Sequence, residues 1–425
     1  MNTQAESSSP LKRSQTASPE PPDGAQRTVK KPKPLVPSQS FAEVLQGMPA
    51  NGSTLAQPNE PTRIDFNKSL VFQLLDAQIH PKDSDSGGSG GALLFGVTEE
   101  GLHVLVHVSV STLPDVASRD AAQRILSHYK IPAMSWMELP AGKYKEAIEP
   151  VSHNHKEVTI LPEDILLQPL ERKTAPLKIL SFDIETNVPA NNTFTDYSNR
   201  AELPVLQIGN ILESTVDDNP QTFRIIFTLK RCPPITGAEV RYYFDEKKLL
   251  SAWRDFVVRS DPDIVTGFNI GIFDLNYLLL RAEELGVPDF ACLGRLKGVN
   301  SIVRKGVPNL ARQFADAPVL AGRLVLDIRQ YIVIHFPEMR TNLNAACQTF
   351  LDTKKEDLDF KIINKLQAGT DMDRRKLAVY CLKDSYLPLR LLKQLQCLEN
   401  SVAEARHGPD PFVSFGRFLR AGRSG

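Results

Sequence analysis

The sequence feature that most constrains the fold is a mainly apolar run, Leu177–Thr186, whose second half carries two acids. Apolar residues lead into Asp183 and Glu185, which is typical of a buried strand with carboxylates at its end. Residues two apart on a strand point to the same face, so both acids project to one side. Two neighbouring carboxylates repel each other, and a divalent cation with oxygen ligands would relieve that repulsion. Because so short a motif also occurs by chance at solvated strand ends, both interpretations stand for this motif alone.

The composition is that of an ordinary globular protein of two or three domains: 425 residues, 41% hydrophobic and 24% charged. A formal net charge of zero does not by itself indicate a nucleic-acid partner. The 5 cysteines are scattered without a C-x-x-C pair, which argues against a disulfide framework or a zinc module. With a polar start and no apolar run of membrane-spanning length, we expect a reducing compartment, the cytosol or nucleus, and no membrane.

Residues 1–62 predict a disordered basic tail, because they are rich in Ser, Pro, Gln, Lys and Arg and nearly lack aromatic residues. Two basic clusters, Lys12-Arg13 and Lys30–Lys33, suit either a bipartite nuclear import signal or a solvated tail. Within the same segment, Ser40–Leu45 is a candidate short helix for an interaction.

Residues 63–172 predict a smaller β-rich domain, with strand-like runs at 70–76, 92–97 and 102–108. His153 and His155 lie close together in the chain. They have no cysteine or paired acid at ligand spacing, so we interpret them as part of a polar loop and not as a metal site.

From residue 173 to 405, strands followed by alternating helices and strands predict an α/β domain with a mixed sheet. We expect strands at 203–212, 223–229, 263–269 and 324–328, and the apolar run 331–334 is also β-prone. We expect helices at 246–259, 273–285, 343–351 and 358–366, and a last long helix over 374–406 that Asp371 or Asp373 caps.

Two further motifs place acids where functional sites often form. Asp274 follows Asn269 at a strand–helix junction, the usual edge for sites in open α/β sheets, although an aspartate there can also be a simple helix N-cap. On the last helix, Tyr380 and Asp384 are four residues apart and therefore share one face. An ordinary half-exposed helix face also carries such residues.

In chain order the motifs are D-x-E on a strand, N-x-x-x-F-D at a junction and Y-x-x-x-D on a late helix. This order resembles the DEDD exonucleases of the RNase H-like fold, in the form with a tyrosine. The surrounding text closely resembles the catalytic subunits of eukaryotic delta-type DNA polymerases of family B, over Leu180–Glu185, Asp261–Gly267, Leu377–Asp384 and Tyr386–Leu392. Trp136–Tyr144 resembles the segment just upstream of that family's exonuclease domain, so the resemblance runs from about residue 63 to 405.

The resemblance implies an RNase H-like exonuclease domain over 173–405, preceded by a shortened β-rich N-terminal domain of family B over 63–172. Such a domain removes mismatched 3′ nucleotides by two-metal hydrolysis in the 3′–5′ direction. The implied metal-binding carboxylates are Asp183, Glu185, Asp274 and Asp384, which with Tyr380 form the catalytic set. The implied cofactor is Mg²⁺, as two ions, for which Mn²⁺ can substitute.

The resemblance also assigns supporting roles. Tyr380 would orient the attacking water, and Asn269 and Phe273 would hold the terminal nucleotides. Asp327 would support the metal ligands without binding a metal itself. The implied partners are a single-stranded or frayed DNA 3′ end and the other subunits of a replicative polymerase, in the nucleus.

The chain departs from the family's pattern in three places. None of the palm's metal-binding motifs or C-terminal cysteine-rich modules occurs in it, so we expect no DNA polymerisation by this chain. Val108–Arg124 replaces a longer stretch, and residues 406–425 form a divergent tail. The alternatives are a non-catalytic DNA-binding or assembly fragment, a truncated version of a full DNA polymerase, or an RNA-directed exonuclease of the same fold.

Overall fold

The structure is a computed structural model that describes residues 40–48, 63–80, 91–109, 126, 130–169, 173–187, 203–214, 221–301, 318–339, 342–353 and 362–407. The chain divides into two compact units, residues 1–33 and 34–425, and every described residue lies in the second unit. The two basic clusters, most of the replaced stretch 108–124 and the tail beyond His407 lie outside the described residues.

One sheet is built from the first strands of the described chain, in the order β5-β6-β3-β2-β1-β4-β7. Its strands are β1 (Leu70–His80), β2 (Gly91–Val97), β3 (His103–Ser109), β4 (Trp136–Leu139), β5 (Lys145–Glu146), β6 (Lys156–Ile160) and β7 (Leu166–Leu167), with the short 3₁₀ helix η1 (Pro162–Asp164) before β7. The predicted strands at 70–76, 92–97 and 102–108 are confirmed. Neighbours pair antiparallel except β3 and β6, and Phe72, Leu94 and Val106 are among the residues of its buried core.

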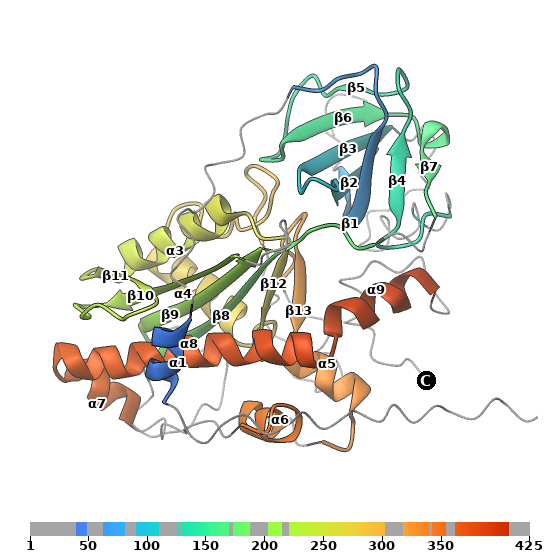
Figure 1. Cartoon of the computed structure of the whole chain (residues 1–425). Coiled ribbons are helices and arrows are strands. Elements are labelled where there is room, and N and C mark those ends of the chain that lie inside the picture. The colour runs from blue at the N-terminus through green and yellow to red at the C-terminus, as the bar shows by residue number, and fades with distance from the viewer. Residues whose placement is uncertain are drawn as a thin grey trace, which may run out of the picture. The chain divides into compact units, whose positions relative to one another are not determined.

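The second sheet carries the strand with the two acids. Its order is β11-β10-β9-β8-β12-β13, which mixes parallel and antiparallel neighbours (Figure 1). The strands are β8 (Lys178–Thr186), β9 (Val205–Ser214), β10 (Gln221–Leu229), β11 (Glu239–Tyr243), β12 (Ile264–Gly267) and β13 (Leu324–Asp327). Strand β8 pairs antiparallel with β9 and parallel with β12, so it lies inside the sheet. The predicted mixed α/β class is confirmed.

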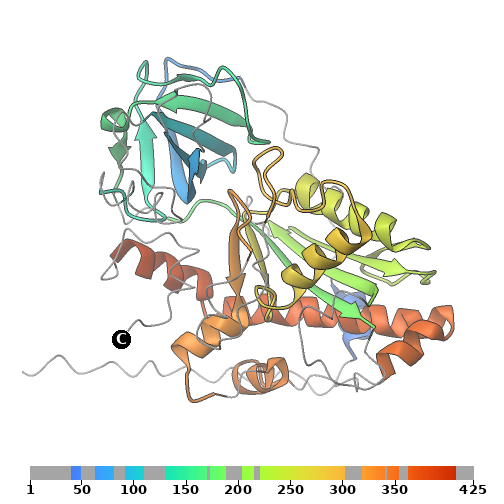
Figure 2. The same cartoon turned by 180° about the vertical axis from the view of Figure 1, so that it is seen from behind.

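The helices are α1 (Phe41–Gly47), α3 (Glu246–Ser260), α4 (Asp274–Leu285), α5 (Ile328–His335), α6 (Leu343–Phe350), α7 (Ile363–Ala368), α8 (Asp371–Gln394) and α9 (Cys397–His407). Helices α3 and α4 cover one face of the second sheet and α8 runs along the other, as Figures 1 and 2 show from opposite sides. Among the described helices, none combines the length and the apolar character that crossing a membrane requires.

Alternate residues of β8 face these two helical layers. Leu180, Phe182 and Ile184 belong to the apolar core with Trp253 of α3. Ile179 belongs to the other core, with the buried residues of α8. The period of two in a strand therefore turns Ser181, Asp183 and Glu185 towards α8.

Two predictions for the last third of the chain are wrong. The β-prone run 331–334 lies in helix α5, because the Asp327 side chain caps that helix by accepting hydrogen bonds from the N–H groups of Arg329 and Gln330. The buried apolar residues of α5 are Ile328, Tyr331 and Ile332, which have the spacing of one helix face, and Gln330 beside them is buried too. The expected single helix over 374–406 is two helices, α8 and α9, because Gln396 between them has a φ of 49°, in the left-handed region.

The start of α8 also differs from expectation. Thr370, not Asp371 or Asp373, is the N-cap, and its hydroxyl accepts a hydrogen bond from Asp373 N at 3.2 Å. Asp373 returns the interaction, since its carboxylate accepts from Thr370 N at 3.0 Å. This reciprocal arrangement is a capping box, which satisfies two backbone donors that the first turn leaves open.

The predicted helix at 40–45 is confirmed as α1, which packs beside α8. The Phe41 and Tyr386 ring centroids are 5.5 Å apart, and Leu45 is fully buried. Gly237 has a φ of +82°, and a Cβ there would lie 2.3 Å from the Leu45 carbonyl oxygen, so only glycine allows the helix to lie this close.

A buried cluster of charges joins β3 to the turn between α3 and β12. His103 contacts Asp261 through Nδ1 at 2.5 Å and Asp263 through Nε2 at 3.1 Å. Arg295 donates to the same two carboxylates at 2.9 and 2.8 Å, and Arg323 also donates to Asp261. Burial alone would raise the pKa of both acids, but the charges of His103 and Arg295 hold the pKa of Asp261 and of Asp263 below the usual range.

His155 lies against this cluster as a hydrogen-bond acceptor. Its Nδ1 accepts from His103 N at 2.9 Å, which requires that nitrogen to be unprotonated. Burial, together with the charge of His103, lowers the pKa of His155 to about 4, so the ring is neutral at physiological pH. Its neighbour His153 donates its backbone N–H to the Arg295 carbonyl.

We expect Arg295→Met to lower the free energy of unfolding by about 3–5 kcal/mol at neutral pH, because it removes from two buried carboxylates a cation that binds both. The acids stabilise the fold above their unfolded pKa of about 3.9, and this contribution is lost as the pH falls through their lower folded pKa. The difference between variant and wild type should therefore shrink in acid. Urea titrations across this pH range measure it.

Lys68→Met is the matched control, since Lys68 is 80% exposed and pairs with Asp65 at the surface. Its loss should change the free energy of unfolding by no more than about 1 kcal/mol. Equal effects of the two substitutions at neutral pH would contradict a structural role for the buried cluster.

Candidate active site

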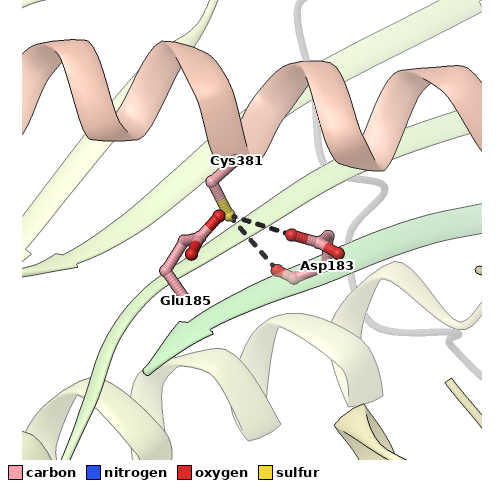
Figure 3. A group of neighbouring side chains, drawn as sticks. All are labelled: Asp183, Glu185 and Cys381. Atoms are coloured by element: carbon pink, nitrogen blue, oxygen red, sulfur yellow. Dashed lines mark hydrogen bonds between the residues drawn. The ribbon is translucent and has the colours of Figure 1, made fainter. Parts of the chain in front are cut away.

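The alternation along β8 places Asp183 and Glu185 under helix α8 (Figure 3). One ligand atom from each of Asp183, Glu185 and Cys381 lies within 4.8 Å of the other two. In the part of the chain that the structure describes, this is the only such grouping of three or more His, Cys, Asp or Glu side chains. Glu185 is buried and Asp183 is half-buried, so the group opens on the side of Asp183.

Asp274 joins this group from the other direction. It is the first residue of α4 and is itself buried, and its Oδ1 accepts a hydrogen bond from Ile184 N at 3.1 Å. The acceptor is thus held by the backbone between the two acids of β8. The simple N-cap interpretation is wrong, because Phe273 takes the cap position and Asp274 turns its side chain to the strand.

The electrostatics place Asp384 with the same group. Burial, followed by the charges of Asp327 and Asp384, raises the pKa of Asp274 to about 8, against the hydrogen bond from Ile184 N. The charges of Asp183, Glu185 and Asp384, after burial, likewise raise the pKa of the Cys381 thiol well above its ordinary value. Asp384 therefore lies close enough to Asp274 and to Cys381 for its charge to act on both side chains.

Helix α8 comes close to the sheet because small residues line the contact. A Cβ on Gly209, which pairs with Asp183 across β8 and β9, would lie 2.6 Å from Ser385 Oγ and 2.9 Å from the Cys381 carbonyl oxygen. Gly209 N donates to Cys381 Sγ at 3.2 Å, and Ser181 Oγ donates to the Ser385 carbonyl at 2.6 Å. These contacts fix the height and rotation of α8 over β8.

Asp327 acts on the loop that leads into α4. Its carboxylate accepts from Asn269 N at 2.8 Å and from Gly271 N at 3.0 Å, in addition to capping α5. Asn269 has a φ of 71°, so this left-handed turn is held in place by Asp327. Four backbone N–H groups thus donate to the Asp327 carboxylate, which fits a residue that supports the loop better than one that binds a metal.

The remaining candidates are Tyr380 on α8, Phe273 at the cap of α4 and Asn269 on the loop before α4. Tyr380 is half-buried one turn before Asp384 and packs against Leu206 and Leu377. Phe273 is half-buried at the start of α4, with its ring centroid 5.6 Å from that of Tyr277. Asn269 is half-buried on the loop that Asp327 holds. Their side chains are accessible in part, as contacts to a ligand require.

The donor set fits a hard divalent cation. Asp183, Glu185, Asp274 and Asp384 offer carboxylate oxygens, the ligands that Mg²⁺ prefers. A bound cation would also relieve the repulsion between neighbouring carboxylates that burial strengthens.

Sequence reasoning missed Cys381, Gly209 and the pair Ser181 and Ser385. The available signal was weak: Cys381 lies between Tyr380 and Asp384, and Ser181 lies on the face of β8 that carries the acids. Nothing in the sequence pairs Gly209 with Asp183, because that contact depends on the register between two strands.

Comparison with known proteins gives one family. The family described as "DNA polymerase family B, exonuclease domain" matches residues 117–336. The DNA polymerase delta catalytic subunit of Dictyostelium discoideum is 41% identical over 288 residues, 67% of this chain and 26% of that protein. The corresponding subunit of Bos taurus is 37% identical over 315 residues, 72% of this chain and 28% of that protein.

The chain therefore spans about a quarter of the length of the curated relatives it matches. Among solved structures, the family B DNA polymerase of the hyperthermophilic archaeon Pyrobaculum calidifontis aligns with a TM-score of 0.59 at 18% identity. That alignment covers 83% of this chain and 48% of the other, and it shows a shared fold.

We expect Gly209→Ala to destabilise the protein by about 1–3 kcal/mol, because the added Cβ overpacks the contact between β9 and α8. Gly47→Ala is the control, since a Cβ there meets nothing within 4 Å and the residue ends helix α1. Thermal unfolding of both variants measures the difference. If Gly209→Ala unfolds at the wild-type temperature, the close approach of α8 does not depend on this glycine.

Proposed function

The chain belongs to family B of the DNA polymerases through that family's exonuclease domain, and we propose that it is a metal-dependent 3′–5′ exonuclease of the RNase H-like type acting on unpaired DNA ends. The observation that carries the proposal is the hydrogen bond from Ile184 N to Asp274, which ties a third acid to the backbone of the residue between Asp183 and Glu185. In this proposal residues 173–405 form the exonuclease domain and 63–172 the preceding β-rich domain.

Asp183, Glu185, Asp274 and Asp384 would hold two Mg²⁺ ions, or Mn²⁺ in their place. When bound, these ions would lower the pKa of the attacking water and neutralise charge on the leaving oxygen. The protein's own contribution is to bring the carboxylates together at fixed positions before the cations arrive. Asp327 contributes indirectly by holding the loop from Asn269 to Gly271.

Tyr380 has a different role, because a phenol is a poor ligand for a hard cation but a good hydrogen-bond partner. It would orient the water whose oxygen forms the new bond to phosphorus. As that bond forms, the bond from phosphorus to the 3′ oxygen of the preceding nucleotide breaks. The products are a nucleoside 5′-monophosphate and a strand shortened by one nucleotide with a free 3′ hydroxyl.

Asn269 and Phe273 would hold the terminal nucleotides. Phe273 offers a half-buried ring on which a base can stack, and base–aromatic stacking is worth about 1–3 kcal/mol per base. Only an unpaired end can reach carboxylates that lie beneath α8. The likeness to delta catalytic subunits from eukaryotes supports a nuclear role beside other replicative polymerase subunits.

The central test uses end-labelled single-stranded DNA with Mg²⁺ or Mn²⁺. We expect stepwise shortening from the 3′ end, and a loss of at least about 10³-fold in Asp183→Asn/Glu185→Gln, because the metal ligands act as a unit. Glu239→Gln, on edge strand β11, is the matched control and should cut like wild type. Activity that survives the double substitution would come from a contaminant or another site, and the proposal would fail.

Tyr380→Phe should lower turnover by about 10- to 100-fold, the range of one hydrogen bond to a charged centre. The KM for Mg²⁺ should hardly change, since the hydroxyl binds no metal. Tyr386→Phe, on the same helix beyond Asp384, is the control and should retain full turnover. A large shift in the Mg²⁺ dependence with unchanged turnover would contradict the assigned role.

A proofreading role makes a further prediction about the DNA end. Unpairing bases costs a few kcal/mol and a mismatch lowers that cost, so cutting should be fastest on single strands, slower on mismatched ends and slowest on matched ends. Primer–template pairs that differ in the last base pair alone measure this order. Equal rates on matched and mismatched ends would leave a general nuclease without proofreading selectivity.

A further inference from the structure

Cys381 gives the carboxylate site a donor of a different chemical kind. Its sulfur is fully buried, lies 3.8 Å from Asp183 Oδ2 and 3.4 Å from the Asp183 carbonyl oxygen, and faces Glu185 as well (Figure 3). The cysteine comes from α8 and the acids from β8, so three donor groups meet from two elements.

The thiol is held in this position by its surroundings. Gly209 N donates to the sulfur at 3.2 Å, and the glycine's lack of a Cβ allows α8 to approach β9. The helix turn that carries Cys381 is anchored one turn later, where the Ser385 carbonyl accepts from Ser181. A donor anchored on both sides loses little freedom when it binds a metal.

The spacing suits a small cation with mixed ligands. Zinc bonds of about 2.3 Å to sulfur and about 2.1 Å to oxygen, at a tetrahedral angle, place the two donors about 3.6 Å apart. The distance from Cys381 Sγ to Asp183 Oδ2 is 3.8 Å, so a small inward movement completes that edge. Magnesium is a hard cation that prefers oxygen ligands, so it would bind the carboxylate oxygens and not the sulfur.

We propose that Asp183, Glu185 and Cys381 form a binding site for thiophilic divalent cations, of which Zn²⁺ and Cd²⁺ are the representatives. On binding, the bond from hydrogen to sulfur is replaced by one from the metal to sulfur, and the proton leaves to solvent. Because two of the ligands are shared with Mg²⁺, such a cation competes with it. That competition rests on the proposed function, whereas binding of the thiophilic cation does not.

The experiment uses the full chain, reduced and freed of metal, titrated with Cd²⁺ while the ultraviolet thiolate-to-cadmium charge-transfer band is followed. We expect a band that saturates at one equivalent in wild type. Cys381→Ser should abolish it and weaken Cd²⁺ binding by more than about tenfold, since even groups outside the ligand set change metal affinity by 10- to 100-fold. Cys347→Ser, which removes another fully buried cysteine on α6, should leave the band unchanged.

A second measurement does not depend on a cysteine variant that folds. X-ray absorption at the zinc edge of wild type loaded with less than one equivalent should show one sulfur at about 2.3 Å beside oxygens. Asp183→Asn should lose that sulfur signal. An oxygen-only shell in wild type, or a cadmium band retained in folded Cys381→Ser, would overturn the inference.

The two proposals fail separately. If wild type binds Cd²⁺ through Cys381 but does not cut DNA with Mg²⁺, the nuclease proposal fails and this site stands. If wild type cuts DNA and shows no sulfur bond to either cation, the nuclease stands and this site fails. Where both hold, Cd²⁺ should inhibit cutting at concentrations that rise by more than about tenfold in Cys381→Ser, relative to each protein's own rate without Cd²⁺.

Discussion

Mutual repulsion among buried carboxylates is the constraint on which the candidate site depends. Burial, followed by the charges of Asp327 and Asp384, raises the pKa of Asp274 to about 8. Burying carboxylates near one another costs folding free energy, which other interactions of the protein must offset. Here the compensation comes from backbone donors, since Ile184 N serves Asp274 and four N–H groups serve Asp327.

The same chain buries acids in a second way, with the opposite electrostatic result. Asp261 and Asp263 lie as deep as Asp274, but Arg295 and His103 accompany them and hold their pKa values down. The direction of the pKa shift thus separates buried acids that are paired with cations from a buried acid that lies near other acids. Burial or residue type alone would not separate them, because all three are aspartates with little exposure.

Much of the fold followed from periodicity, and the part that did not follow depends on tertiary contacts. The strand at Asp183 and helices α3 and α4 have long amphipathic or apolar patterns, and they were predictable to within a few residues. The run 331–334 is apolar and is compatible with a strand or a helix. The cap that Asp327 provides favours the helix. The pairing of Arg295 with two distant acids has no local signature, because the partners are more than thirty residues apart.

Because side chains alternate along β8, the number of residues before Asp183 decides which face of the sheet carries the acids. Inserting or deleting one residue before Asp183 would exchange the two faces. Leu180, Phe182 and Ile184 would then turn towards α8, and both acids would enter the apolar layer beneath Trp253. Evolution can therefore exchange single side chains around this strand far more readily than it can change the number of residues between the strand's start and its acids.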